Sequence, residues 1–195
     1  MSAATPLLRS LHEDLRAGTA ARHAALDASL TTAGCTDSLA GYAGFLCGTA
    51  RFRFGVETAL EAAGVETLLD DWPDRRRGPL LIDDLVALGH PLPEAPEAEA
   101  PALVQGDLAR LVGMAYVLEG SVLGGALLSR RAAPLGVDRF AGASYLQSCA
   151  DAVKGWSRFL DRLKCVDTPS FDRRSAIAAA RETFEFAGAC YAAVR

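Results

Sequence analysis

The stretch YVLEGSVLGGALL, residues 116–128, is an apolar run of helical length that three glycines, Gly120, Gly124 and Gly125, interrupt. Each glycine in a helix interior costs about 1 kcal/mol relative to alanine. The glycines therefore need close helix packing or a ligand that approaches the backbone, unless the stretch is not helical. Gly120 and Gly124 are one helical turn apart and would expose bare backbone on the same face. From these residues alone, tight packing and a flat ligand are equally good explanations.

The rest of the chain predicts an all-α protein around this stretch. Alanine is frequent, β-branched residues are thinly spread, and almost no segment alternates apolar with polar residues. Cap and break signals predict helices from Thr5 to Gly34, with Gly18 as a candidate break, from Ser38 to Gly64, from Gly78 to Gly89, from Ala102 to Arg131, from Ser144 to Lys164 and from Thr168 to Tyr191. The proline-rich residues 90–101 are expected to form a loop inside the domain.

Length and composition favour a single domain that spans residues 1–195. Half of the residues are apolar, which is enough for a sizeable core. The net charge of −4 and the lack of a long basic run argue against a nucleic-acid partner. No uninterrupted apolar run reaches the roughly 18 residues of a membrane helix, and the first residues lack the order of a signal peptide. We therefore expect a cytoplasmic protein that binds neither nucleic acid nor a membrane.

Histidine and cysteine usage limits the metal chemistry that the chain could support. The five cysteines are scattered singly and are expected to be reduced and mostly buried. The only histidines are His12, His23 and His90, and no HExxH, Glu-x-x-His, Cys/His cluster, P-loop or GxSxG motif is present. A single imidazole acting as a ligand or base is what remains.

Of the three histidines, His23 has the most suggestive neighbours. His12 stands on an expected solvated face and His90 precedes a proline in the loop, so both are interpreted as incidental. Arg16, Thr19 and His23 are spaced i, i+3 and i+7, so one helical face would present a cation, a hydroxyl and an imidazole. That set suits a ligand with an anionic end and a central metal. A half-buried histidine on an amphipathic helix is the more frequent explanation for such a residue on its own.

Three segments resemble heme oxygenases, most closely the bacterial type associated with bacteriophytochromes. They are TAARHAALD, residues 19–27, YVLEGSVLGGALLSRR, residues 116–131, and WSRFLDRL, residues 156–163. The resemblance covers nearly the whole chain in order, including RRRGPLLIDDLVALG, residues 75–89, and LEGSVLGG is its specific element. It implies an all-α fold in which heme lies between a proximal helix and a kinked, glycine-rich distal helix.

The resemblance also implies roles for individual residues. His23 matches the proximal iron ligand, and Gly120, Ser121, Gly124 and Gly125 match the distal segment over the open face of the iron. Ser121 stands where mammalian members carry an aspartate, so Gly120, Ser121 and Gly124 are the expected catalytic segment. Guanidinium groups and hydroxyls suit the heme carboxylates. The further candidates for heme contacts are Arg16, Thr19, Tyr116, Arg158, Arg162 and Phe184. Surface ion pairs explain the arginines equally well, and core packing explains Tyr116 and Phe184.

The activity implied by the resemblance is oxidative cleavage of heme to biliverdin, carbon monoxide and ferrous iron with O2. Electrons would come from an external reductant such as a ferredoxin, and a bacteriophytochrome would be a candidate receiver of the biliverdin. The run Arg75–Arg77 would suit an acidic donor, although a solvated loop is the simpler explanation. The alternatives are a heme-binding protein of the same fold without turnover and a heme-free scaffold. A di-iron or thiaminase-like use of the architecture needs ligands or a nucleophile that are not evident in the sequence.

Overall fold

The computed structural model describes residues 9–94 and 99–193, and within these ranges it contains helices and no strand. The elements are α1 (Leu11–Thr32), α2 (Leu39–Ala62), η1 (Val65–Thr67), α3 (Trp72–Arg75), α4 (Gly78–Ala87), α5 (Leu108–Ala132), η2 (Ala133–Leu135), α6 (Ser144–Asp151), α7 (Val153–Val166) and α8 (Arg173–Ala192). The expected all-α fold is confirmed. The extent of the domain stays a prediction.

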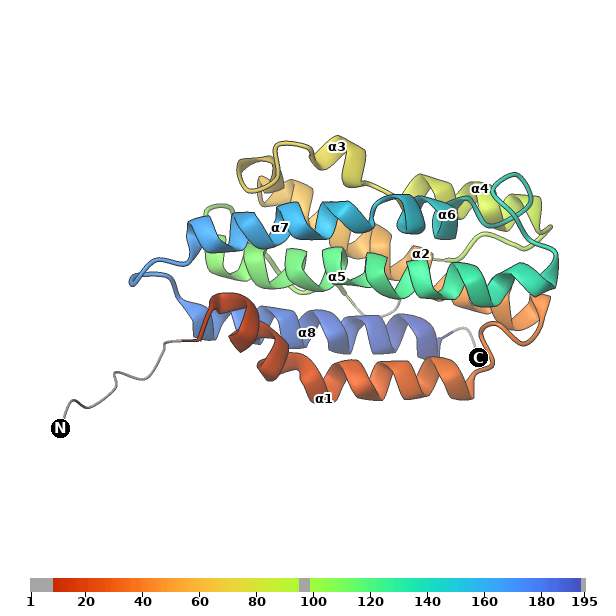
Figure 1. The fold of residues 1–195 in the computed structure, drawn as a ribbon, viewed down its shortest axis with the longest axis horizontal. Coiled ribbons are helices and arrows are strands. Elements are labelled where there is room, and N and C mark those ends of the chain that lie inside the picture. Colours follow the sequence, from red (N-terminus) through yellow and green to blue (C-terminus); the bar gives the residue numbers. More distant parts are fainter. Residues whose placement is uncertain (1–8, 95–98, 194–195) are drawn as a thin grey trace.

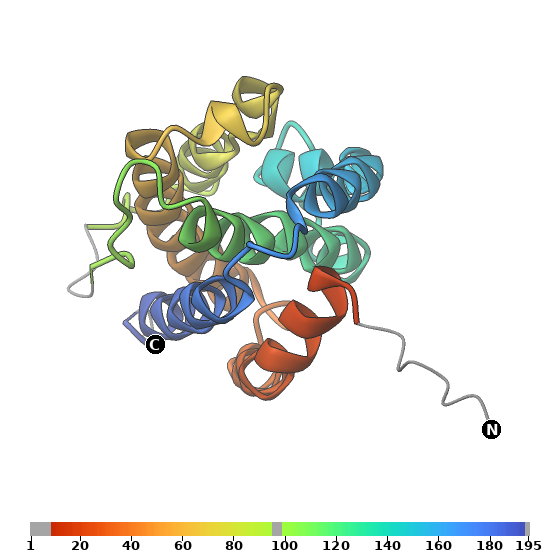
Figure 2. The same ribbon diagram turned by 90° about the vertical axis from the view of Figure 1, so that its left-hand side faces the viewer.

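Helix α5 is the central element of the fold. It packs against α2, α6, α7 and α8, and the end-on view in Figure 2 shows it surrounded by the other long helices. Helix α1 packs mainly on α8 and lies along the outside of the bundle (Figure 1). The segment Leu108–Leu135 is apolar and long enough to cross a membrane, but 61% of its most apolar window is buried inside the protein. Burial of this kind is typical of a core helix.

The glycines expected to interrupt helices do not break them. Helix α5 runs without a break through Gly120, Gly124 and Gly125, so the kink implied by the family resemblance does not interrupt the helix. Helix α1 likewise continues through Gly18, where an added Cβ would lie 2.6 Å from the Ile177 side chain of α8. Gly18 therefore allows close packing of α1 on α8, and its predicted role as a break is wrong.

Some predicted helix ends are confirmed. The Ser38 hydroxyl accepts a hydrogen bond from the Gly41 amide at 3.1 Å and caps α2. Helix α4 begins at Gly78 with proline next, as expected. Gly34 and Gly64 follow α1 and α2 with positive φ angles of 62° and 82°, which glycine adopts without strain.

Other predicted ends are wrong because a later or distant residue supplies the cap. Helix α5 begins at Leu108 after Asp107 rather than near Ala102, and α8 begins after Asp172 rather than at Thr168. The Thr5 cap lies outside the described residues. The helix expected from Ser144 is divided at Ala152 into α6 and α7. At the start of α6, the Asp84 carboxylate of α4 accepts the amides of Ser144 and Tyr145, at 2.8 and 2.9 Å.

Candidate functional site

One face of α5 is apolar and lacks a packing partner along part of its length. An added Cβ on Gly120 would meet only Trp156, at 3.8 Å, and one on Gly124 would meet nothing within 4 Å. Leu123 and Leu127 on the same side are 37% and 48% exposed. These four residues, with Tyr116 one turn before Gly120, form a helical stripe that we call the glycine face. Its glycines are not explained by helix packing.

Other glycines of α5 do serve packing. Gly125 is buried, and an added Cβ there would lie 2.7 Å from the Cys149 sulfur of α6. A Cβ on Gly113 would overlap the backbone carbonyl oxygen of Ala176 on α8. The assignment of Gly125 to the heme face is therefore wrong, because this residue brings α5 and α6 together. Within α5, close helix packing therefore explains Gly113 and Gly125, whereas Gly120 and Gly124 are left for the ligand explanation.

His23 lies on α1 with 62% of its side chain exposed. Its Nδ1 is 3.0 Å from the Asp27 carboxylate one turn later, and its ring packs edge-on against Phe184 of α8, with centroids 5.7 Å apart. A carboxylate that accepts the Nδ1 proton leaves the lone pair of the neutral ring on Nε2. No hydrogen bond to Nε2 occurs within the described chain. The ring is thus oriented as a metal ligand would be.

The α1 residues before His23 contact the start of the glycine face. Burial raises the pKa of Tyr116, while its hydrogen bond to Thr19 and the charge of Arg16 oppose that rise. Helices α1 and α5 run in the same direction in Figure 1. One turn beyond Thr19 is His23 and one turn beyond Tyr116 is Gly120, so His23 is at the level of the glycines.

Thr19 and Arg16 differ in how free their side chains are. The Thr19 hydroxyl is buried, donates to the Leu15 carbonyl of the same helix at 2.8 Å and bonds Tyr116 of α5. Arg16 is exposed and forms no ion pair with any described residue. Of the two, Arg16 is the one able to reach a ligand carboxylate.

His12 and Trp156 also lie at the beginning of the glycine face. The His12 ring is 6.2 Å from Tyr116 and 5.9 Å from Trp156, and these last two rings are 5.8 Å apart, measured between centroids. His12 is therefore half-buried against these rings, and its predicted place on a solvated face is wrong. Trp156 was not predicted as a site residue, and a lone tryptophan in an amphipathic helix offers no signal beyond core packing.

Ser121 faces α2 rather than the glycine face. Its hydroxyl donates to the Leu118 carbonyl at 2.6 Å and accepts from the Arg53 guanidinium at 3.3 Å. Arg53 is fully buried and pairs with Glu57 at 2.8 Å. The Ser121 hydroxyl is thus held toward the buried pair of Arg53 and Glu57.

Arg158 and Arg162 are not brought to the glycine face. Arg162 pairs with Asp70 at 2.7 Å, and Arg158, 73% exposed, lies 3.7 Å from Asp71. Two residues after Trp156, Arg158 is on nearly the opposite side of α7. Both guanidinium groups therefore meet the acidic residues before α3.

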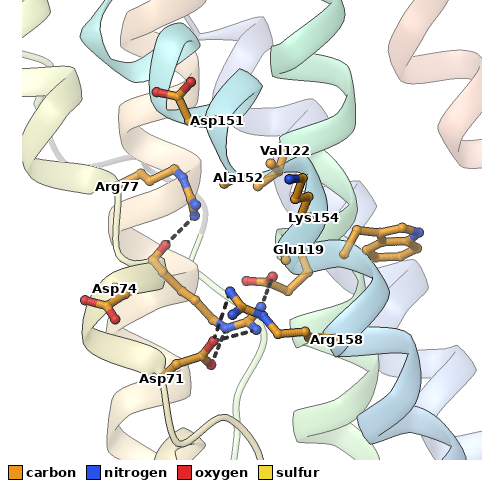
Figure 3. Close-up of a pocket in the computed structure, with 12 residues that line it drawn as sticks. Asp71, Asp74, Arg77, Glu119, Val122, Asp151, Ala152, Lys154 and Arg158 are labelled. Carbon is orange, nitrogen blue, oxygen red and sulfur yellow. Dashed lines mark hydrogen bonds and ion pairs between the residues drawn. The ribbon is translucent and has the colours of Figure 1, made fainter.

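Behind α5, away from the glycine face, is a polar cavity of about 460 Å³. Figure 3 shows its charged lining, with Asp151 and Asp71 toward opposite ends. Arg75 donates to Asp71 at 2.6 and 2.9 Å and also to Glu119. The Arg75 hydrogen bonds hold the pKa of Asp71 below its ordinary value despite partial burial. This buried ion network was missed by sequence reasoning, although a glutamate inside the apolar stretch 116–128 was a signal.

The arginine run is not a surface patch. Arg75 and Arg77 are each 5% exposed, and Arg77 donates to the Arg75 carbonyl and to Ser148 at 2.7 and 3.1 Å. Only Arg76 reaches the surface, where it pairs with Glu61 at 2.8 Å. The suggestion that this run docks an acidic electron donor is therefore wrong.

Comparisons with known proteins agree on one family. No protein-family model matches the chain. It is 29% identical over 144 residues to heme oxygenase PigA of Pseudomonas aeruginosa, covering 73% of this chain and 72% of that protein. It is 32% identical over 143 residues to heme oxygenase of Xanthomonas campestris, covering 73% of this chain and 84% of the relative. The crystal structure of NO- and CO-bound heme oxygenase from Neisseria meningitidis has the same fold, with a TM-score of 0.82, 23% identity and coverage of 96% and 92% of the two chains. On the strength of these relatives, the chain belongs to the heme oxygenase family.

Proposed function

We propose that this chain cleaves heme to biliverdin, carbon monoxide and ferrous iron, with His23 as the axial ligand and the glycine face on the other side of the macrocycle. The proposal is carried by His23, which Asp27 orients on α1 at the level of Gly120 and Gly124, two α5 glycines that helix packing does not explain. Helical glycines without packing partners lower stability, so a ligand that needs the bare backbone accounts for them better than the fold does.

The residues present fit the group that the family implies. The face is apolar, as the macrocycle is, and a neutral imidazole is a suitable iron ligand. Bound heme would be both the substrate and the site at which O2 is activated. The backbone at Gly120 and Gly124 would lie close to it and leave room only for small molecules. Asp27 would hold the His23 ring in the tautomer that presents Nε2.

Heme carboxylates would be met by residues at the beginning of the glycine face. Arg16 is the strongest candidate, because it is exposed without an ion-pair partner in the described residues and lies near Tyr116. Arg158 and Arg162 would first have to leave Asp71 and Asp70, so we place them second. Phe184 would support the His23 ring on the side of α8.

We propose the electron donor and the receiver of the product only as classes of protein. Electrons would come from an external reductant such as a ferredoxin, and the likeness of LEGSVLGG to the bacteriophytochrome-associated type supports a photoreceptor as receiver of the biliverdin. The burial of 61% of the most apolar window of this helix supports a cytoplasmic protein that does not use α5 as a membrane anchor.

Hemin titration followed by reduction tests the proposal. The purified protein should shift the Soret band on binding hemin and, with O2 and ascorbate or ferredoxin and its reductase, convert it to biliverdin. A Soret shift without biliverdin would leave a heme-binding protein of the same fold, and no shift would exclude both. His23→Ala should change the axial-ligand spectrum; an unchanged spectrum would refute the ligand assignment.

A further inference from the structure

The polar cavity and the glycine face share one residue, Trp156. It lines the cavity together with Glu119 and Arg75. Its Cζ3 and Cη2 atoms lie 3.8 and 3.9 Å from the position that a Cβ on Gly120 would take. Trp156 therefore borders the charged cavity, and its ring lies against the apolar face on which heme would lie.

The indole is held in this position by other aromatic rings. Trp156 is half-buried, and its ring centroid lies 5.8 Å from Tyr116, 5.9 Å from His12 and 5.6 Å from Phe159. Contacts at these separations are favourable for aromatic pairs. The ring is thus a packed apolar barrier rather than a freely rotating side chain.

The cavity has the size and polarity to hold water. At about 30 Å³ per water molecule, about 460 Å³ has room for several molecules, and its lining is rich in charged groups. Lys154, Asp74 and Asp151 at its rim are exposed to solvent. In its wall, Glu119 has a buried Oε1 atom without a hydrogen-bond partner among the described residues. Water is the smallest group that would supply the missing donor.

We propose that the Trp156 indole is the partition between this water-filled cavity and the glycine face, and that it controls the access of water and small anions to that face. The inference rests on the proposed heme site. Water and anions compete for an open iron position, so a site that binds O2 gains from a barrier on the side where solvent is nearest. The four basic residues of the cavity lining offset its four acidic ones, so the cavity would admit a small anion if the barrier were removed.

Azide binding to the ferric hemin complex tests the partition. The association rate is measured by stopped flow for the wild type, Trp156→Ala and the milder Trp156→Phe, whose shorter ring does not reach as far toward Gly120. Trp156→Ala should accelerate association roughly tenfold, which corresponds to a barrier lower by about 1.4 kcal/mol. Trp156→Phe should give a smaller increase, and it carries the test if the alanine variant does not fold by circular dichroism.

Lys154→Ala is the matched control, because Lys154 lies on α7 at the rim of the same cavity without touching Gly120. With Trp156 present, Lys154→Ala should leave the azide association rate unchanged. In the Trp156→Ala background, where the cavity route is open, Lys154→Ala should lower that rate. Hemin complexes with normal spectra and equal azide rates in all variants would overturn the partition alone. Loss of hemin binding by both folded Trp156 variants would also overturn it, since the ring would then be part of the binding wall. A wild type that gives no Soret shift would instead refute the proposed heme site itself.

Discussion

Replacing Gly120 and Gly124 by alanine should stabilise the ligand-free protein and weaken its binding of hemin. A methyl group on Gly120 would make an ordinary contact with Trp156 at 3.8 Å, and one on Gly124 would enter open space. Each replacement should gain about 1 kcal/mol of helix stability, so the double variant should gain about 2 kcal/mol. For a chain of this length that corresponds to a rise in Tm of roughly 4–8 °C.

The same methyl groups would project from the face against which the macrocycle is proposed to lie. They would hold it away from the backbone, and we expect a hemin Kd at least roughly tenfold higher, a loss of about 1.4 kcal/mol. Thermal melts followed by circular dichroism measure the first effect, and Soret titration measures the second. The double variant should therefore be more stable than the wild type without ligand and yet bind hemin more weakly. An ordinary packing defect would lower the stability of the ligand-free protein instead.

Gly125→Ala and Gly113→Ala are the matched controls from the same helix. Their added methyl groups would press on Cys149 and Ala176, and such overpacking costs about 1–3 kcal/mol. Both should lower Tm. If Gly120→Ala/Gly124→Ala also lowered Tm, or raised it without changing the hemin Kd, the interpretation of these glycines as a ligand face would be refuted.

The remaining predictions concern the proposed ligand and the buried ions. His23→Ala should leave the free energy of unfolding within about 0.5 kcal/mol, since the side chain is largely exposed, and its hemin complex should recover an imidazole-ligated spectrum when free imidazole is added; a large loss of stability would contradict this. Asp27→Ala should raise the hemin Kd by roughly 10-fold to 100-fold through loss of ring orientation, and an unchanged Kd would show that the contact is incidental. Arg53→Met should cost about 3–5 kcal/mol in urea unfolding, because it leaves Glu57 buried without its cation, and a cost below about 1 kcal/mol would refute this. Arg75 lowers the pKa of Asp71 in the folded state, so the stability that Asp71 contributes is present above its unfolded pKa of about 3.9 and is lost as pH falls through the lower folded value. Asp71→Asn should therefore flatten the acid limb of stability against pH, and an identical limb would contradict the linkage.

Local chemistry was enough to predict much of the fold. The scarcity of alternating segments indicated helices, and Ser38 and the Gly78–Pro79 pair marked helix starts, because caps act within one turn. Caps supplied from elsewhere were missed. Asp84 caps α6 from 60 residues away, and no local pattern around Ser144 indicates it.

For the site, the sequence alone determined that the glycines of residues 116–128 needed a special explanation and that His23 was the best-placed imidazole. It did not determine which glycine served which purpose. Only the tertiary structure showed that Gly125 packs against α6 while Gly120 and Gly124 stay open, because the answer depends on residues far away in the chain. The burial of Arg75 and Arg77 likewise depends on residues far away in the chain. A guanidinium is stable inside a protein only beside its partners, and Glu119 meets Arg75 only after α3 and α5 have packed.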